Sequence, residues 1–64
     1  MFVNGKEVIL NGPQSLDSFL KKENYSKNRI AVEINGKIIA KKNYETYMLQ
    51  QDDEIEIVCF VGGG

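Results

Sequence analysis

The chain contains 64 residues, of which 42% are hydrophobic, and its eight basic and nine acidic side chains give a net charge of −1. A chain of this length forms one small domain whose core contributes only about 3–5 kcal/mol, which excludes a two-domain enzyme. The nearly neutral charge gives no field that would hold a nucleic-acid backbone or an anionic membrane, so neither is expected as a partner. Function is therefore expected on the surface or at one end of the domain.

The chain has one cysteine and no histidine. An internal disulfide and a Cys/His zinc site are both excluded, so no metal is expected and the fold must depend on packing. The longest apolar run, 57–61, is far shorter than the ~20 residues of a membrane span, and no basic segment precedes an apolar stretch near Met1. This composition predicts a soluble cytoplasmic protein with an unprocessed start.

Charge is distributed unevenly along the chain. Residues 1–42 hold all eight basic groups and four acids, a balance of +4, whereas residues 43–64 hold five acids and no base, a balance of −5. Two interpretations remain open for the acidic part. It is either a solvated strand face and turn, or a surface that steers the protein toward a basic partner.

Two Asn-Gly pairs, Asn4-Gly5 and Asn35-Gly36, lie between apolar or alternating segments. A type I′ turn needs positive φ at both central residues, which Asn and Gly tolerate, so each pair predicts a β-hairpin. The strand before the second pair alternates large apolar residues with Ala31 and Glu33, as expected for a strand with one buried face. The predicted strands are 1–3 with 6–10, and 30–34 with 37–40.

The segment 16–23 is predicted to form a helix after the loop 11–13. Ser15 stands at the N-cap position, where its hydroxyl can accept from a free backbone N–H of the first turn. Asn24 can end the helix in a left-handed conformation. The apolar stripe of this helix, at i, i+3 and i+4, consists of Leu16, Phe19 and Leu20.

A weaker helical signal follows Lys41-Lys42. Asn43 is a possible cap, and Tyr44, Tyr47 and Met48 stand at helical spacing, so one short helical turn is predicted. Tyrosines at this spacing are expected to pack in the core rather than to form a ligand platform.

The last predicted strand runs from Glu54 to Val61, and its two faces differ. One face is apolar throughout, whereas the other changes from Glu54 and Glu56 to Val58 and Phe60. Apolar residues on both faces are expected of a strand with neighbours on both sides, and the first strand is a natural neighbour. One helix covers only one face of a mixed sheet, so the other face must meet solvent or a partner.

Three glycines, Gly62, Gly63 and Gly64, follow this strand, so a domain over 1–61 and a flexible tail over 62–64 are predicted. A frayed terminus is the alternative, but the position directly after a strand apolar on both faces favours a functional tail. Without Cβ atoms, the tail can enter a narrow channel in extended form and present its terminal carboxylate. Conversion of that carboxylate to a mixed anhydride with AMP would let a sulfur nucleophile attack. The tail would then be a substrate and not a catalyst.

Docking of such a tail requires an apolar patch beside it, and Val58 and Phe60 are the candidates. Packing of these two side chains within the chain is the alternative. An enzyme hypothesis would depend on Cys59, but its sequence neighbours supply no cation and the chain has no histidine as a base. A structural role is therefore expected for Cys59.

The pattern as a whole resembles the ThiS family, the sulfur carriers of thiamine biosynthesis. The resemblance covers the whole chain and rests on the two Asn-Gly hairpins flanking a helix, the Asp-rich turn 50–53, the strand 54–58 and the ending 60–64. It implies an α+β fold of the ubiquitin-like β-grasp type, with a mixed sheet of about five strands, one main helix on one face and a short helical turn. The last strand would be central and parallel to the first.

The resemblance also implies partners and site residues. A ThiF-like adenylyltransferase would use ATP to adenylate the Gly64 carboxylate, and a cysteine desulfurase would supply the sulfur that converts it to a thiocarboxylate. Thiazole synthase would accept that sulfur. Gly62 and Gly63 would supply clearance, while Val58 and Phe60 would contact the partners. The chain would be a protein co-substrate with no catalytic residue and no bound cofactor.

Two other functions fit the same pattern. The small subunit of molybdopterin synthase uses the same tail chemistry on the same fold, although its members are usually longer. A non-covalent β-grasp interaction module would have a tail that is never activated. Intact mass after incubation with ATP, an adenylating enzyme and a sulfur source distinguishes that module from a carrier.

Overall fold

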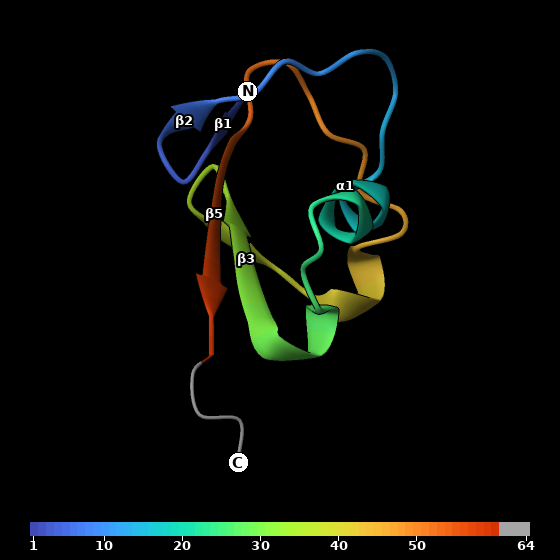
Figure 1. The fold of residues 1–64 in the computed structure, drawn as a ribbon, viewed down its shortest axis with the longest axis vertical. Helices are drawn as coiled ribbons and strands as arrows, with labels where there is room; N and C mark the ends of the chain where they lie inside the picture. Colours follow the sequence, from blue (N-terminus) through green and yellow to red (C-terminus); the bar gives the residue numbers. More distant parts are fainter. Residues whose placement is uncertain (61–64) are drawn as a thin grey trace.

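The computed structural model describes residues 1–60 and contains a five-stranded sheet, one α-helix and two 3₁₀ turns (Figure 1). The elements in chain order are β1 (Phe2–Val3), β2 (Lys6–Glu7), α1 (Leu16–Lys22), η1 (Lys27–Arg29), β3 (Ile30–Ile34), β4 (Lys37–Ile39), η2 (Lys41–Asn43) and β5 (Glu54–Cys59). The strand order in the sheet is β2-β1-β5-β3-β4. Helix α1 lies on one side of this sheet, as Figure 1 shows.

The sheet is mixed because its middle strand has neighbours of opposite direction. Strand β5 runs parallel to β1 and antiparallel to β3, which confirms the expected central position and the expected parallel pairing with the first strand. The contact with β1 is short, since it pairs only with Glu54 and Ile55. The contact with β3 extends along the strand as far as Cys59.

Both predicted hairpins are present. Asn4 and Gly5 have φ of 51° and 83°, and Asn35 and Gly36 have φ of 53° and 83°, as the predicted turn requires. The first hairpin is shorter than predicted, because β2 ends at Glu7 and the chain then leaves the sheet toward α1.

The turn asparagines also bind the central strand. The Oδ1 atom of Asn4 accepts from the N–H of Ile57 at 2.8 Å, and the Oδ1 atom of Asn35 accepts from the N–H of Glu54 at 3.0 Å. Each asparagine therefore supplies a left-handed turn residue and also satisfies a backbone donor of β5. These two contacts tie both hairpins to the strand that leads into the glycine tail.

Helix α1 forms as predicted and ends one residue earlier. The Ser15 hydroxyl accepts from the Ser18 N–H at 3.1 Å, and Asn24 adopts a φ of 64° beyond the helix end. The predicted apolar stripe is buried against the sheet, and Leu16 has no exposed surface. Asp17 is also buried on this helix and forms an ion pair with Lys21 at 3.1 Å.

The second helical turn lies earlier than predicted. It spans Lys41–Asn43 with Ala40 as its N-cap, so the prediction that Asn43 would be the cap is wrong. The 3₁₀ turn η1 was not predicted at all, because Lys27–Arg29 carries no apolar periodicity.

The segment after η2 does not continue as a helix because it caps α1. The carbonyl of Tyr47 accepts from the N–H of Leu16, and the carbonyl of Tyr44 accepts from the N–H of Asp17, both at 2.8 Å. These N–H groups belong to the first turn of α1 and have no partner inside the helix. In a longer helix these two carbonyls would accept hydrogen bonds from residues of the same helix. Here they accept from the first turn of α1 instead.

The core lies between α1 and one face of the sheet. Tyr44 is buried and Tyr47 packs against the core, which confirms the packing role predicted for the tyrosines, whereas Met48 is 45% exposed. The buried apolar residues are Met1, Leu10, Leu16, Phe19, Leu20, Ile30, Val32, Ile34, Tyr44, Leu49, Ile55 and Ile57.

Candidate functional site

The candidate site is the end of β5, from which the glycine tail continues. The strand ends at Cys59, and the N–H of Phe60 still donates to the carbonyl of Arg29 at 2.8 Å. A backbone hydrogen bond therefore still holds Phe60 to the folded domain, one residue after β5 ends. The predicted continuation of the strand to Val61, the predicted boundary at 61 and the tail 62–64 lie outside the described residues.

Val58 and Phe60 are both exposed, each with 58% of its surface accessible. Val58 pairs with Ala31 on the face of the sheet that α1 does not cover, while the alternate residues Ile55 and Ile57 are buried on the helix side. The alternative that these two side chains pack within the chain is therefore wrong. They form an exposed apolar patch directly before the tail.

Cys59, for which a structural role is expected, is a free and exposed cysteine. Alternation places it on the side of Ile55 and Ile57, but β1 borders β5 only at Glu54 and Ile55. The last part of β5 therefore has a strand neighbour on one side only, and Cys59 is left at the open flank. Its exposure gives no support to a packing role.

The start of β5 is fixed by the buried carboxylate of Asp53, which is 2% exposed. Its oxygens accept from the Nδ2 of Asn35 at 2.9 Å, the hydroxyl of Tyr47 at 3.1 Å and the N–H of Gln50 at 2.9 Å. This network joins the β3–β4 turn, the segment after η2 and the turn before β5. Sequence reasoning missed it, and the only available signal was the acidic turn itself.

The same network changes the titration of Tyr47. Burial raises the pKa of Tyr47 above its usual 10.0, and the hydrogen bond to Asp53 and the charges of Asp53 and Asp52 raise it further. Burial alone raises the pKa of Tyr44.

We expect the stability contributed by Tyr47 to disappear in alkaline solution. Because its pKa is raised in the folded state, the neutral phenol stabilises the fold fully below about pH 10, and this stabilisation is lost as the pH rises through the folded-state pKa. The difference in free energy of unfolding between the wild type and Tyr47→Phe, measured by urea denaturation from neutral pH to about pH 11, should therefore shrink as the pH rises above about 10. A constant difference between the two proteins over this range would contradict the assignment.

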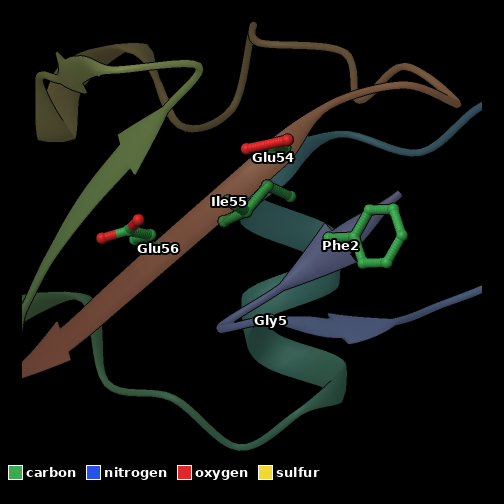
Figure 2. A pocket seen from close by; sticks show the side chains of 5 residues that line it. All are labelled: Phe2, Gly5, Glu54, Ile55 and Glu56. Atoms are coloured by element: carbon green, nitrogen blue, oxygen red, sulfur yellow. The ribbon is translucent and has the colours of Figure 1, made fainter.

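The acidic part of the chain divides into internal and surface groups. Asp53 is buried and hydrogen-bonded, whereas Glu54 and Glu56 lie on the open face of the sheet. Both glutamates line a hollow of about 260 Å³ together with Phe2, Gly5 and Ile55. Figure 2 labels these five residues and shows Phe2 on β1 beside Glu54, Ile55 and Glu56 of β5. A solvated strand face accounts for part of the acidic excess, and the buried network accounts for another part.

Two further observations concern residues 1–60. This part of the chain contains no helix that is both long and apolar enough to cross a membrane. It also contains no group of three or more acidic or cysteine side chains arranged to hold a metal ion.

A mixed five-stranded sheet with a central last strand and one helix across one face defines a ubiquitin-like β-grasp protein. The chain belongs to the ThiS family, whose model matches residues 1–64. The crystal structure of the thiamine biosynthesis protein ThiS from Geobacter metallireducens has the same fold, with a TM-score of 0.81 at 24% identity over 98% of this chain and 96% of that one. The predicted fold class is therefore confirmed.

Two curated relatives extend the comparison. The chain is 36% identical over 63 residues to the uncharacterized protein ycf40 of Trieres chinensis, covering 98% of this chain and 86% of that protein. It is 32% identical over 62 residues to a thiazole synthase of Magnetococcus marinus. That match covers 97% of this chain but only 19% of the thiazole synthase.

Proposed function

We propose that this ThiS-family chain is a sulfur carrier for thiazole formation in thiamine biosynthesis and that Gly64 carries the sulfur. The observation that supports this most strongly is the family match over all of residues 1–64, the three terminal glycines included. The geometry at the end of β5 also supports the proposal. A backbone hydrogen bond holds Phe60 to the domain, and the apolar side chains of Val58 and Phe60 are exposed immediately before the tail. A protein partner can use that patch to align the tail.

The proposed loading takes place in three steps on a ThiF-like adenylyltransferase. The Gly64 carboxylate attacks the α-phosphorus of ATP, so that pyrophosphate leaves and an acyl-adenylate forms. The terminal sulfur of a persulfide, generated from cysteine by a desulfurase, then attacks the acyl carbon and AMP leaves. A thiol finally attacks the donor sulfur of the resulting acyl disulfide, which leaves a thiocarboxylate on Gly64 and a disulfide between donor and thiol.

Thiazole synthase is the proposed acceptor. Its similarity to this chain over 19% of its length indicates that a ThiS-like segment and a thiazole synthase occur in one polypeptide. After transfer of the sulfur to the growing ring, the Gly64 carbonyl would be either a free carboxylate again or part of an acyl intermediate that water hydrolyses to the carboxylate. Apart from the Gly64 carboxylate itself, the proposal assigns no nucleophile and no base to this chain, and ATP belongs to the adenylating partner.

Glycine at positions 62 and 63 has a physical role in this proposal. A residue without a Cβ occupies the least width in an extended conformation, so the tail can reach an enclosed active site. Ordering each of these residues costs about 1–2 kcal/mol. Burial of Val58 and Phe60 against the partner would each return about 1.5–3 kcal/mol, which offsets that cost.

Replacement of Phe60 by Asp should weaken partner binding without destabilising the fold. The side chain is 58% exposed, so the charge enters solvent in the free protein but must be buried in the complex. We expect a roughly tenfold or larger rise in the KM for loading, with little change in the urea midpoint. Ile9→Asp is the matched control, because Ile9 is 76% exposed but lies in the loop after β2. A large loss of stability in Phe60→Asp would show that Phe60 belongs to the core.

The proposed function is tested by intact mass spectrometry of the chain after incubation with ATP, the adenylating enzyme and a cysteine–desulfurase sulfur source. A sulfur carrier gains the mass of one sulfur in exchange for one oxygen. Subsequent incubation with thiazole synthase and its other substrates should reverse the shift, and failure at this second step would favour a molybdopterin pathway. No exchange in the first step would favour a non-covalent interaction module.

A further inference from the structure

Strand β2 forms a free edge of the sheet. It is the first strand in the order β2-β1-β5-β3-β4, and Figure 1 shows it at the outer margin of the sheet. The N–H of Val8 donates to the carbonyl of Met1 at 2.8 Å, so the neighbouring pair, Glu7 with Phe2, is one that exchanges no backbone hydrogen bond. The N–H and C=O of Glu7 therefore point away from β1, toward the free edge.

A hollow of about 350 Å³ lies beside this edge, between the β1–β2 hairpin and α1. Val3 and Val8 line it from the hairpin side, and Phe19 and Tyr25 line it from the helix side. Figure 2 shows α1 behind the hairpin, which places the hollow on the helix side of the sheet. Its volume falls within the ~300–1,000 Å³ of typical ligand pockets, so it has room for a large apolar side chain.

The charges at the edge have both signs. Lys6 lines the hollow from the strand and Glu23 lines it from the end of the helix, and both are exposed. Within residues 1–60 neither takes part in an ion pair. Glu7, next to Lys6, lies on the opposite face of β2 because side chains of a strand alternate. Short, charged edge strands resist indiscriminate pairing, so this edge favours a segment whose charges match.

We propose that the β2 edge binds an extended segment of another protein, which adds to the sheet as an additional strand antiparallel to β2. The residue opposite Glu7 is basic and exchanges both backbone hydrogen bonds with it. The next residue, opposite Lys6, is acidic, and the preceding residue, opposite Val8, is apolar and fills the hollow. The occupant therefore carries the consecutive triplet apolar–basic–acidic.

Proximity decides which charges of the site select this triplet. Residues directly opposite in neighbouring strands have their Cβ atoms about 4.5–5.5 Å apart, and opposite charges in this position attract. Lys6 and Glu7 are the direct neighbours of an added strand, whereas Glu23 stands on the far wall of the hollow. The two residues of β2 therefore determine the order of the charges.

A second copy of this chain fits the edge less well. Antiparallel pairing of two β2 strands about a two-fold axis at Glu7 would place the two Glu7 side chains opposite each other, and like charges in this position destabilise a sheet. A segment of another protein is free of this restriction. Charge complementarity therefore favours a different protein as the occupant.

This inference goes beyond the proposed function and does not depend on it. Strand β1 pairs with β5 only at Glu54 and Ile55, near the start of β5, whereas the glycine tail follows the end of that strand. The edge site and the tail thus lie toward opposite ends of β5. A segment bound at β2 would hold a partner protein on the domain while the tail is used.

The test uses a blocked peptide of about nine residues, valines and threonines around a central Leu-Lys-Glu. Its counterpart has the central sequence Leu-Glu-Lys, so only the order of the two charges differs. Each peptide is titrated into the isotope-labelled chain, and the dissociation constant is obtained from the amide shifts. We expect the Glu7 amide to shift with the first peptide, and the second to bind about tenfold more weakly.

The protein variant Lys6→Glu/Glu7→Lys provides the matched exchange. Both residues are exposed and the net charge is unchanged, so the variant should fold as the wild type does. It should prefer the Leu-Glu-Lys peptide by a similar factor. Equal affinities of the wild type for the two peptides, or the same preference in wild type and variant, would overturn the inference.

Backbone methylation of the peptide tests the added strand itself. A methyl group on the nitrogen of the central lysine removes the donor that faces Glu7 and should abolish binding, whereas a methyl group on the next nitrogen, which points away from β2, should leave binding intact. Equal effects of the two methyl groups would contradict strand addition. A Glu7 amide that shifts with protein concentration alone, together with a dimer in sedimentation, would assign the edge to a second copy and overturn the proposal.

Discussion

Deletion of Gly64 should abolish sulfur loading and leave the free energy of unfolding unchanged. The deleted chain still ends in a glycine carboxylate, but that group stands about 3.3–3.6 Å short of its former position. Adenylation requires near-contact between the carboxylate and the α-phosphorus, and a displacement of this size removes the reacting geometry. A rate reduction of about 100-fold or more is expected in the loading assay, since even a displacement of ~1 Å can cost that factor.

Addition of one alanine after Gly64 should have an equally large effect for a different reason. The acyl carbon of Gly64 would then belong to a peptide bond and could not be adenylated, and the new carboxylate would carry a Cβ. Far-ultraviolet circular dichroism and urea denaturation should give wild-type curves for both variants, because both changes lie beyond Phe60, the last residue that the structure describes, and outside its sheet and core. Wild-type loading of either variant would show that the position of the carboxylate is irrelevant.

Replacement of the buried Asp53 by Ala should destabilise the fold strongly, and far more than replacement of its exposed neighbour Asp52. The buried carboxylate accepts from Asn35, Tyr47 and Gln50, and its removal leaves these donors without their partner. A loss of about 2–4 kcal/mol is expected, which is most of the ~3–5 kcal/mol available to a domain of this size. Much of the variant should therefore be unfolded in dilute buffer, as measured by the urea midpoint.

Asp52→Ala is the matched control for this experiment. Asp52 is the adjacent residue of the same turn and is exposed, so its removal should change the free energy of unfolding by less than about 0.5 kcal/mol. Similar urea midpoints for the two variants would mean that the Asp53 network does not hold β5. A folded Asp53→Ala protein that still loads sulfur would separate the stability of the body from the chemistry of the tail.

Local signals in the sequence were sufficient to predict most elements. The Asn-Gly pairs locate both hairpins because the positive φ of a type I′ turn is a property of the turn residues themselves. The cap at Ser15 and the stripe that includes Leu16 likewise act within one or two helical turns. Predictions of this kind need no knowledge of the tertiary structure.

Contacts between distant segments were not predictable in the same way. The hydrogen bond from Ile57 to Asn4 joins residues 53 positions apart, and nothing in the hairpin sequence indicates that the turn side chain has this second role. The position of η2 depends on the carbonyls of Tyr44 and Tyr47 being used by α1. The exposure of Cys59 depends on how far β1 extends along β5. Each error concerns a tertiary contact rather than a local preference.

The same distinction between local patterns and contacts across the fold applies to the candidate site. Alternation along the last strand predicted the exposure of Val58 and Phe60, because side chains of a strand alternate between its faces. The open face as a whole was not predictable, since it combines residues from every strand of the sheet and needs the register between them. The role of Gly64 remains a prediction from the glycine run and the family match.

The central claim is that sulfur is carried on the carbonyl of Gly64, and the most direct measurement is tandem mass spectrometry of the loaded chain. The account predicts one sulfur in place of one oxygen, located on the C-terminal fragment and retained after treatment with a thiol reductant. The exposed Cys59 provides the contrasting result, because a persulfide there would add a sulfur without loss of oxygen and would be removed by the reductant. Sulfur found on Cys59 and absent from Gly64 would contradict the account.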